Sequence, residues 1–264
     1  NIPRPYVEYT LKVLIEDEED LDWRDNEPDK PGIRRVLCFF PAAPVQGPFL
    51  SLLRHDEDEG IRLVHGLTNR ATEVWRTSMQ TEGMLGTPLT PAPLALQLPS
   101  GEKTFWGDEH VYRWHRGTSV GPPAVVSSLM ALEMWLEEQL ESGRDAEELF
   151  AKVLAGSDSV AVLGVCASVS VFAPDRCLAA VLPLLSHPRL WRMDVARRAN
   201  EAPGRPPISL PNTEALDRIR AQWALYSDKL HHAPMCPANH YHGQRAPTYR
   251  CTCGAVEAQK ESRP

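Results

Sequence analysis

The sharpest catalytic-looking string in the sequence is Gly117-Thr118-Ser119-Val120-Gly121, a G-x-S-x-G pattern. In hydrolases this pattern places a nucleophilic serine on a strained turn between a strand and a helix, and amides at the helix start help to form the oxyanion hole. Here Pro122 and Pro123 follow directly. They remove two amide donors and disfavour helical backbone in the residue before each proline. The string therefore predicts a glycine-rich loop leading into a helix, with a serine hydrolase that uses Ser119 as the alternative.

A second group of reactive side chains lies near the C-terminus, where cysteines and histidines gather in a polar, turn-rich segment. Zinc takes four thiolate or imidazole ligands in a tetrahedron, and a small loop-rich segment has little core to hold it otherwise. The spacing departs from paired Cys-x2-Cys knuckles, so two alternatives stay open, a structural zinc site and a disordered or non-native tail. The predicted zinc ligands are Cys236, His240, Cys251 and Cys253, with His242 as the substitute.

Nucleotide-binding motifs are missing from the sequence. It contains neither G-x-x-x-x-G-K-[ST] nor G-x-G-x-x-G, the glycine-rich turns whose backbone amides cradle phosphates. If ATP takes part, its site is expected on another part of a longer protein, and we expect no cofactor in this segment apart from the zinc. Residue 1 is Asn rather than Met, which also leads us to expect a processed product or a piece of a longer chain.

Composition and charge exclude several classes of protein. The 264 residues are 42% hydrophobic and 24% charged, with 35 acidic and 28 basic side chains and a net charge of −7. We therefore expect a globular protein without a nucleic-acid partner for the molecule as a whole. The longest apolar run, Val160 to Ala173, is shorter than the roughly 20 residues of a membrane span. Cys166 and Cys177 lie in apolar stretches, which predicts buried free thiols in a reducing cytoplasm.

Apolar residues at helical spacing recur along most of the chain and predict its helices. Asp56, Asp145, Asp158 and Asp175 stand where N-terminal caps are expected. The segment Val160–Phe172 is apolar nearly all round and should be central. Helices are expected over residues 6–15 (with a strand as the alternative), 48–53, 57–79, 122–142, 145–154, 160–172 and 174–185, and a further one from 188.

One region breaks the helical pattern. Glycines and prolines between residues 83 and 99 exclude a long helix there. The aromatic-rich segments Lys103–Trp106 and His110–Trp114 then predict a small β-hairpin insertion near residues 95–116, with a turn at Ser100-Gly101. On such a strand His110 and His115 would face opposite sides, so we do not expect them to chelate a metal together.

The predicted fold is therefore mainly α, with stacked αα-hairpins of a HEAT-like kind or an irregular helical bundle. We expect a helical domain with the hairpin insertion over residues 1–202, a linker and amphipathic helix over 203–227, and the Cys/His-rich tail over 228–264. The tryptophans of the predicted helices are expected in the core: Trp75, Trp135, Trp191 and Trp223. A basic patch is expected to be a solvated helix face, with an anionic partner as the alternative: Arg189, Arg192, Arg197 and Arg198.

A resemblance to a known family is carried by five segments of the sequence. They are Gly47-Pro48-Phe49-Leu50, Leu67-Thr68-Asn69-Arg70-Ala71-Thr72, Arg116 to Pro122, Leu129 to Leu136 and Ser157 to Val171. Together they resemble a helical region of large bacterial multidomain ATP-binding (NTPase) proteins of the stress or anti-phage-defence type. The resemblance covers roughly residues 3–200 and implies that the ATPase lies elsewhere in a longer chain, so no active-site residue is carried over. The Cys/His tail lies outside it.

Three functions follow as hypotheses. The first is a non-catalytic helical scaffold or sensor region of a larger, ATP-dependent bacterial protein, which is cytoplasmic, has no membrane contact, and binds protein partners or neighbouring domains. The second is a serine hydrolase with Ser119 as nucleophile and His187 or a tail histidine as base. The third is a zinc-binding adaptor that contacts nucleic acid through its arginine-rich C-terminal third.

Overall fold

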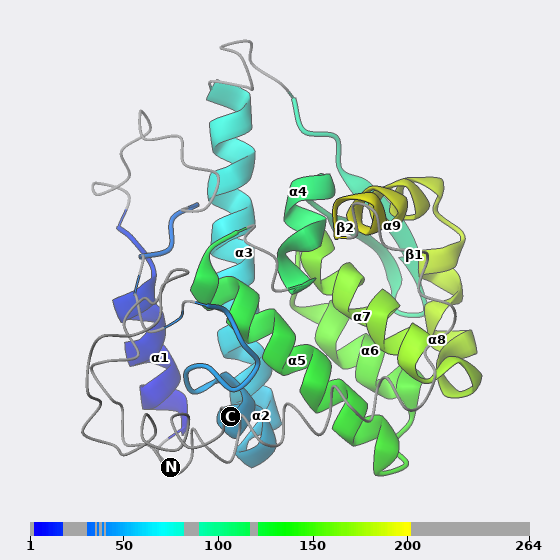
Figure 1. Ribbon diagram of the computed structural model, residues 1–264, viewed down its shortest axis with the longest axis horizontal. Coiled ribbons are helices and arrows are strands. Elements are labelled where there is room, and N and C mark those ends of the chain that lie inside the picture. Colours follow the sequence, from blue (N-terminus) through cyan, green and yellow to red (C-terminus); the bar gives the residue numbers. More distant parts are fainter. Residues whose placement is uncertain are drawn as a thin grey trace, which may run out of the picture. The chain divides into compact units, whose positions relative to one another are not determined.

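The computed structural model describes residues 3–17, 31–34, 36, 39, 41–81, 90–116 and 121–201 (Figure 1). These residues belong to one compact unit, Asn1–Glu201. Within them the protein is mainly helical and carries one two-stranded antiparallel hairpin, which confirms the predicted fold class. The expected helix within 203–227, with Trp223, and the Cys/His-rich tail lie outside the described residues.

The helices begin and end close to the predicted positions, and the ambiguous N-terminal segment is a helix. A four-residue helix and a 3-10 turn, which the sequence did not predict, precede the long central helices. The elements are α1 (Pro3–Leu14), α2 (Phe49–His55), α3 (Glu57–Thr81), β1 (Leu94–Leu98), β2 (Gly101–Phe105), α4 (Glu109–Tyr112), η3 (Arg113–Arg116), α5 (Pro123–Glu141), α6 (Ala146–Ala155), α7 (Val160–Phe172), α8 (Pro174–Leu185) and α9 (Pro188–Glu201).

Two of the four predicted caps are confirmed. The Asp145 carboxylate accepts a hydrogen bond from the Glu148 amide at 2.9 Å, and Asp56 accepts one from the Glu59 amide at 3.2 Å. The predicted cap of α7, Asp158, was wrong by one residue, because the Ser159 hydroxyl accepts a hydrogen bond from the Ala161 amide. Helix α8 has no side-chain cap at all. Asp175 lies inside its first turn, because Pro174 occupies the first helical position, where a proline loses no hydrogen bond.

The β-hairpin is real but shorter than predicted. Its register pairs Leu94 with Phe105, and the chain turns just before Gly101, whose φ is +117°. The prediction of a strand over His110–Trp114 was wrong, since these residues form α4 and the start of η3. Asp108 starts the helical turn by accepting hydrogen bonds from the amides of residues 110 and 111. The aromatic and branched side chains that suggested a strand are instead buried on this turn.

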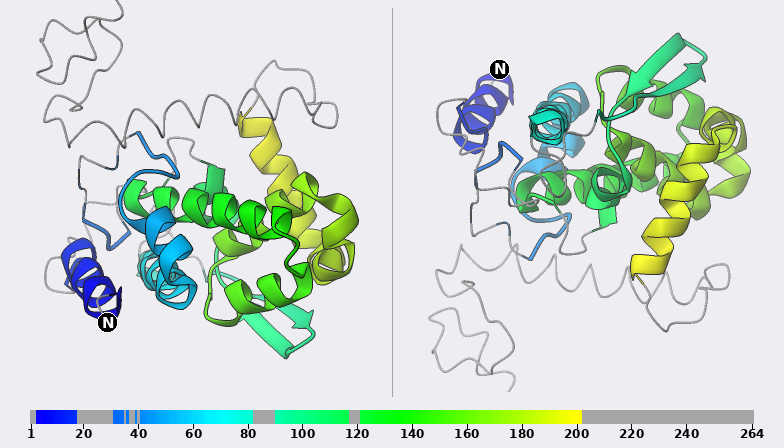
Figure 2. Two further views of the ribbon diagram at one scale, coloured as in Figure 1. Left: turned by 90° about the horizontal axis from the view of Figure 1, so that it is seen from below. Right: turned by 90° about the horizontal axis from the view of Figure 1, so that it is seen from above.

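The helices pack in sequence across the unit. Helix α1 lies against α3, α2 against α3 and α5, α5 against α7, and α7 against α8. In both views of Figure 2, α1 lies at one side of this stack and α8 and α9 lie at the other. Helix α1 therefore closes one end of the stack, and α8 and α9 close the other.

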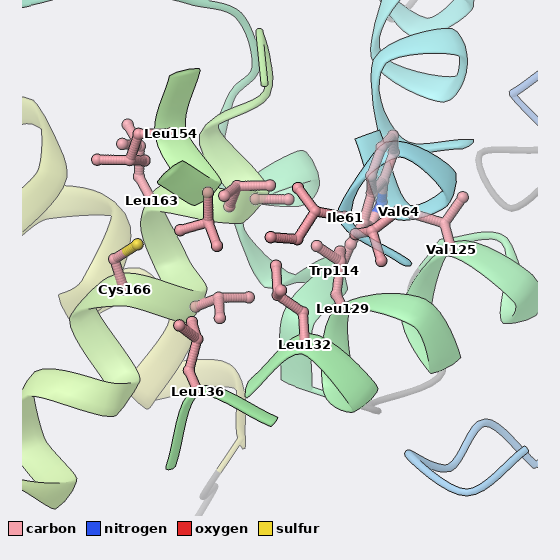
Figure 3. Close-up of a cluster of buried hydrophobic side chains, with 14 of the residues drawn as sticks. Ile61, Val64, Trp114, Val125, Leu129, Leu132, Leu136, Leu154, Leu163 and Cys166 are labelled. Carbon is pink, nitrogen blue, oxygen red and sulfur yellow. The ribbon is translucent and has the colours of Figure 1, made fainter. Parts of the chain in front are cut away.

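One continuous apolar core joins the layers. Figure 3 shows side chains that converge from α3, η3, α5, α6 and α7. Leu132 and Leu136 of α5 and Trp114 of η3 are among those that are almost wholly buried. The core lies between α3 and α7, and α7 is buried on nearly all sides, which confirms its predicted central place. Trp75 and Trp135 are buried as predicted.

Helix α7 and η3 approach each other closely in this core. A Cβ added at Gly164 would lie 2.4 Å from Nδ1 of His115, so only glycine lets the imidazole ring lie against the helix. The ring is buried, and its Nδ1 is 2.6 Å from the Tyr112 carbonyl oxygen.

We expect Gly164→Ala to lower the free energy of unfolding by about 1–3 kcal/mol, because the new methyl group overlaps an imidazole ring that has no room to move. Chemical denaturation followed by circular dichroism measures the change. Alanine has the higher helix propensity by about 1 kcal/mol. A variant as stable as the wild type, or more stable, would contradict the close contact.

Candidate interaction surface

The structure leaves most of the predicted chemistry untested. Ser119 and the four predicted zinc ligands, Cys236, His240, Cys251 and Cys253, lie outside the described residues, as does His242. Across the part of the chain that the structure describes, no group of three or more His, Cys, Asp or Glu side chains could hold a metal ion. The serine hydrolase and the zinc site therefore stay predictions.

The titratable side chains of the core are held away from solvent. Burial, with Arg116 nearby, lowers the pKa of His115 to about 3, and burial also lowers the pKa of His65. Burial raises the pKa of the Cys166 thiol. Cys166 and Cys177 are buried free thiols, as the sequence predicted. Because neutral forms are favoured at each of these positions, the groups contribute packing rather than charge.

His110 and His115 do not lie on a common strand. His110 belongs to the exposed side of α4 and is only partly buried, and its ring stands edge-on to Trp114 at a centroid distance of 6.3 Å. His115 packs against Gly164 in the core. The expectation that the two would face opposite sides of a strand is replaced by this helical arrangement.

A row of apolar side chains lies exposed on α8 and continues on α9. In an ordinary surface helix the side away from the core is polar. Here residues 178, 182 and 185 share one side of α8, and 191 and 195 share one side of α9. We call these five residues the α8–α9 face: Leu178 (61% exposed), Leu182 (56%), Leu185 (41%), Trp191 (55%) and Val195 (65%).

The prediction that Trp191 belongs to the core was wrong. Its ring is exposed, and its indole Nε1 donates a hydrogen bond to the Leu185 carbonyl oxygen at 2.7 Å. This bond joins the end of α8 to the start of α9. It also holds the indole in place before any partner arrives. An aromatic ring that is already fixed loses less conformational entropy on binding.

The sides of α8 and α9 that lie opposite the exposed row pack against the core and hold the two helices in place. Cys177, Val181 and Leu184 of α8 are buried, as are Leu190 and Met193 of α9. Both helices thus use one apolar side for the core and still present a second apolar side to solvent. Helix α8 carries no charged residue between Cys177 and Leu185, so no turn of this stretch presents an ionised group to water.

The charge around the face is positive. Helices α8 and α9 carry five arginines and three acidic residues, of which Asp175 lies on the same side of α8 as Leu178. On α9, Arg198 follows Trp191 by seven positions and Val195 by three, so it shares their side of the helix. Arg192 lies at the edge of the same row. Both arginines are exposed, and neither has an ion-pair partner within the described ranges.

Two other arginines of the predicted basic patch are structural. Arg189 donates to the carbonyl oxygens of Ala92 at 2.6 Å and Gly107 at 2.9 Å, which fastens α9 to the base of the hairpin. Arg197 donates to the Asp194 carboxylate at 2.8 Å. The prediction of a solvated basic face therefore applies to only half of the patch.

A polar pocket of about 290 Å³ lies between α4 and α9. Asp108 and Arg189, which line it, are already committed to the α4 cap and to backbone carbonyls. Glu109 and Arg192 are the remaining charged groups of the lining. Two acidic and two basic groups balance, so the pocket favours neither an anion nor a cation.

The opposite end of the stack has a smaller apolar row. On α1, the exposed residues Tyr6, Tyr9 and Val13 lie at positions i, i+3 and i+7 and so share one side of the helix. In stacked helical proteins the terminal repeats ordinarily carry a polar outer side that keeps them soluble. Both ends of this stack depart from that pattern.

The sequence contained a signal for the α8–α9 face, which the prediction missed. The stretch Cys177–Leu185 of α8 lacks charged residues and therefore has apolar groups on more than one side, and only one side of a terminal helix can be buried. Among the described residues, none of the helices is long and apolar enough to cross a membrane.

A scan against protein-family models found no match, and none of the curated proteins matches the chain, so the proposal for its function rests on these surfaces.

Proposed function

We propose that this chain is a non-catalytic helical scaffold or sensor region of a larger, ATP-dependent protein, and that it mediates contacts with protein partners or neighbouring domains. The observation that carries the proposal is the α8–α9 face, which leaves three leucines, a valine and a tryptophan in contact with water. Exposed apolar patches of this kind mark interaction surfaces. The bacterial, ATP-dependent context comes from the resemblance of residues 3–200 to a helical region of such proteins.

The buried titratable groups support a non-catalytic role. His115, Cys166 and Tyr112 are almost inaccessible to solvent, and neighbouring side chains or backbone groups hold them. A general base or nucleophile must come within hydrogen-bond reach of its substrate. The α8–α9 face offers apolar and guanidinium groups instead, which suit binding.

Leu182→Glu, made in the complete reading frame that contains these residues, is expected to weaken the proposed contact by tenfold or more. A charge placed in the middle of an apolar interface must be buried without a partner, and about 1.4 kcal/mol suffices for a tenfold change. Site-specific photocrosslinking from position 182 identifies the contacting domain or protein, and its co-purification with the wild type and the variant measures the loss.

The matched control is Ala151→Glu, which places the same charge at an exposed helical position of α6, outside the five residues of the α8–α9 face. This variant should retain the contact. The proposal fails if position 182 gives no crosslink, or if the Leu182 and Ala151 variants co-purify equally well with the crosslinked species. It also fails if neither the complete protein nor the crosslinked partner hydrolyses ATP.

A further inference from the structure

The shape of the α8–α9 face indicates the kind of segment that covers it. The exposed leucines of α8 repeat at four and three positions, and Trp191 lies at the junction with α9. A row at this spacing on one helix fits the apolar side of another helix, whose residues repeat in the same way. Tryptophan and arginine are also the residues that most often dominate binding energy. Trp191 with Arg198 on the same side of α9 is such a pair.

The charge around the face selects the chemistry of that helix. Arg192 and Arg198 border the apolar row on α9, where the nearby Asp194 is already paired with Arg197. A partner with acidic residues beside its apolar stripe would pair with these guanidinium groups. We infer that the α8–α9 face binds an amphipathic helix of a protein partner or neighbouring domain whose apolar residues are flanked by Asp and Glu. This inference rests on the proposed function and adds the partner's chemistry.

A second copy of the chain and a lipid surface fit the face less well. A symmetric contact whose axis passes through α9 would bring Arg192 and Arg198 of one copy towards the same arginines of the other, and like charges oppose each other across an interface. Anionic membranes are recognised by clusters of about four to eight basic residues. The face has two arginines that are not already bonded within the described residues, Arg192 and Arg198.

The test uses the full 264-residue chain and two fluorescently labelled synthetic helical peptides. Both have leucines at positions i, i+3, i+4 and i+7, and one carries Glu at its flanking positions where the other carries Lys. Fluorescence anisotropy should show the Glu peptide binding at least tenfold more tightly than the Lys peptide. Raising the salt concentration should weaken the binding, because exposed charge pairs are screened.

Two variants locate the binding site and its charge. Leu182→Glu should weaken binding of the Glu peptide at least tenfold, while the control Ala151→Glu leaves it unchanged. Arg198→Glu should reduce or reverse the preference between the two peptides. Circular dichroism of each variant, compared with the wild type, establishes that the helices are intact.

Several results would overturn the inference. These are no binding of either peptide, equal binding of both, or binding of the Glu peptide that Leu182→Glu does not change. Binding to vesicles of anionic phospholipid in place of the peptide would indicate a lipid surface. Concentration-dependent self-association that Leu182→Glu abolishes, without peptide binding, would indicate a second copy. If photocrosslinking from position 182 still captures a partner that lacks acidic flanks, the scaffold function stands and only the partner's chemistry is wrong.

Discussion

Leu132→Ala is expected to lower the free energy of unfolding by about 2–5 kcal/mol, whereas Leu182→Ala should change it by about 0.5 kcal/mol or less. Leu132 is wholly buried in the cluster that joins α3, α5 and α7, and its truncation leaves a cavity (Figure 3). Leu182 is 56% exposed on α8, so its truncation leaves no cavity. The same chemical change at two helical leucines therefore separates core from surface.

Urea denaturation followed by far-UV circular dichroism measures both values under one set of conditions. Leu182→Ala also serves as the control for the interaction tests, because it removes apolar contact area without adding a charge. Similar losses for the two variants would contradict the exposed position of α8's outer side. A loss for Leu132→Ala below about 1 kcal/mol would contradict the central position of α5, since a buried leucine seldom costs so little to truncate.

The stability of the protein is expected to fall as the pH drops from 6.5 towards 5, with a slope from His115 that approaches about 1.4 kcal/mol per pH unit. Burial lowers the pKa of His115 to about 3, whereas the ordinary value is 6.5. Arg116 disfavours the imidazolium further, the Tyr112 carbonyl opposes this shift, and Arg197 adds a smaller disfavouring effect. His65 shifts in the same direction because it too is buried.

The direction in which stability changes with pH follows from proton binding. Below pH 6.5 the unfolded chain binds a proton at residue 115 that the folded protein does not bind until the pH nears 3. The stabilisation is therefore complete above pH 6.5 and is lost as the pH falls towards 3. The window from pH 5 to 6.5 lies above the usual range of carboxylates, so protonation of pairs such as Glu57 with Arg144 contributes little there.

Denaturation midpoints of the wild type and of His115→Gln, measured at several pH values in this window, test the expectation. In His115→Gln, the slope of stability against pH should be smaller by about the contribution of one histidine, whatever the stability of the variant at pH 7.5. His65→Gln provides a second measurement at another buried imidazole, whose Nε2 donates a hydrogen bond to the Val153 carbonyl oxygen at 2.7 Å. Identical slopes in the wild type and both variants would refute the link to these rings.

Local sequence predicted most of the elements because their signals are local. The spacing of apolar residues indicates α3, α5 and α7, and prolines at 123, 174 and 188 mark helix starts where no amide hydrogen bond is lost. The failures were local as well. The segment His110–Trp114 combines aromatic and branched residues that suit a strand, but the Asp108 cap and burial against α7 favour a helical turn.

The candidate surface could be predicted only in part. The arginines of α9 were visible as a basic patch, yet which of them are free depends on carbonyl groups of residues 92 and 107, which are distant in sequence. The residues around Trp191 have the same spacing and composition as those around a buried tryptophan, so the sequence pattern does not distinguish the two cases. Whether such a ring is buried depends on whether another helix packs on that side of α9.

By itself, the amino-acid sequence determined the mainly helical class, the short hairpin, the central place of α7 and the absence of a nucleotide-binding motif, because periodicity, prolines and motif strings act over a few neighbouring residues. Only the tertiary structure decided which apolar sides are covered. Helix α8 is apolar on more than one side, and α7 and α6 can cover just one of them. The side that remains exposed, with Trp191 and its arginines, is a property of the packing rather than of the pattern.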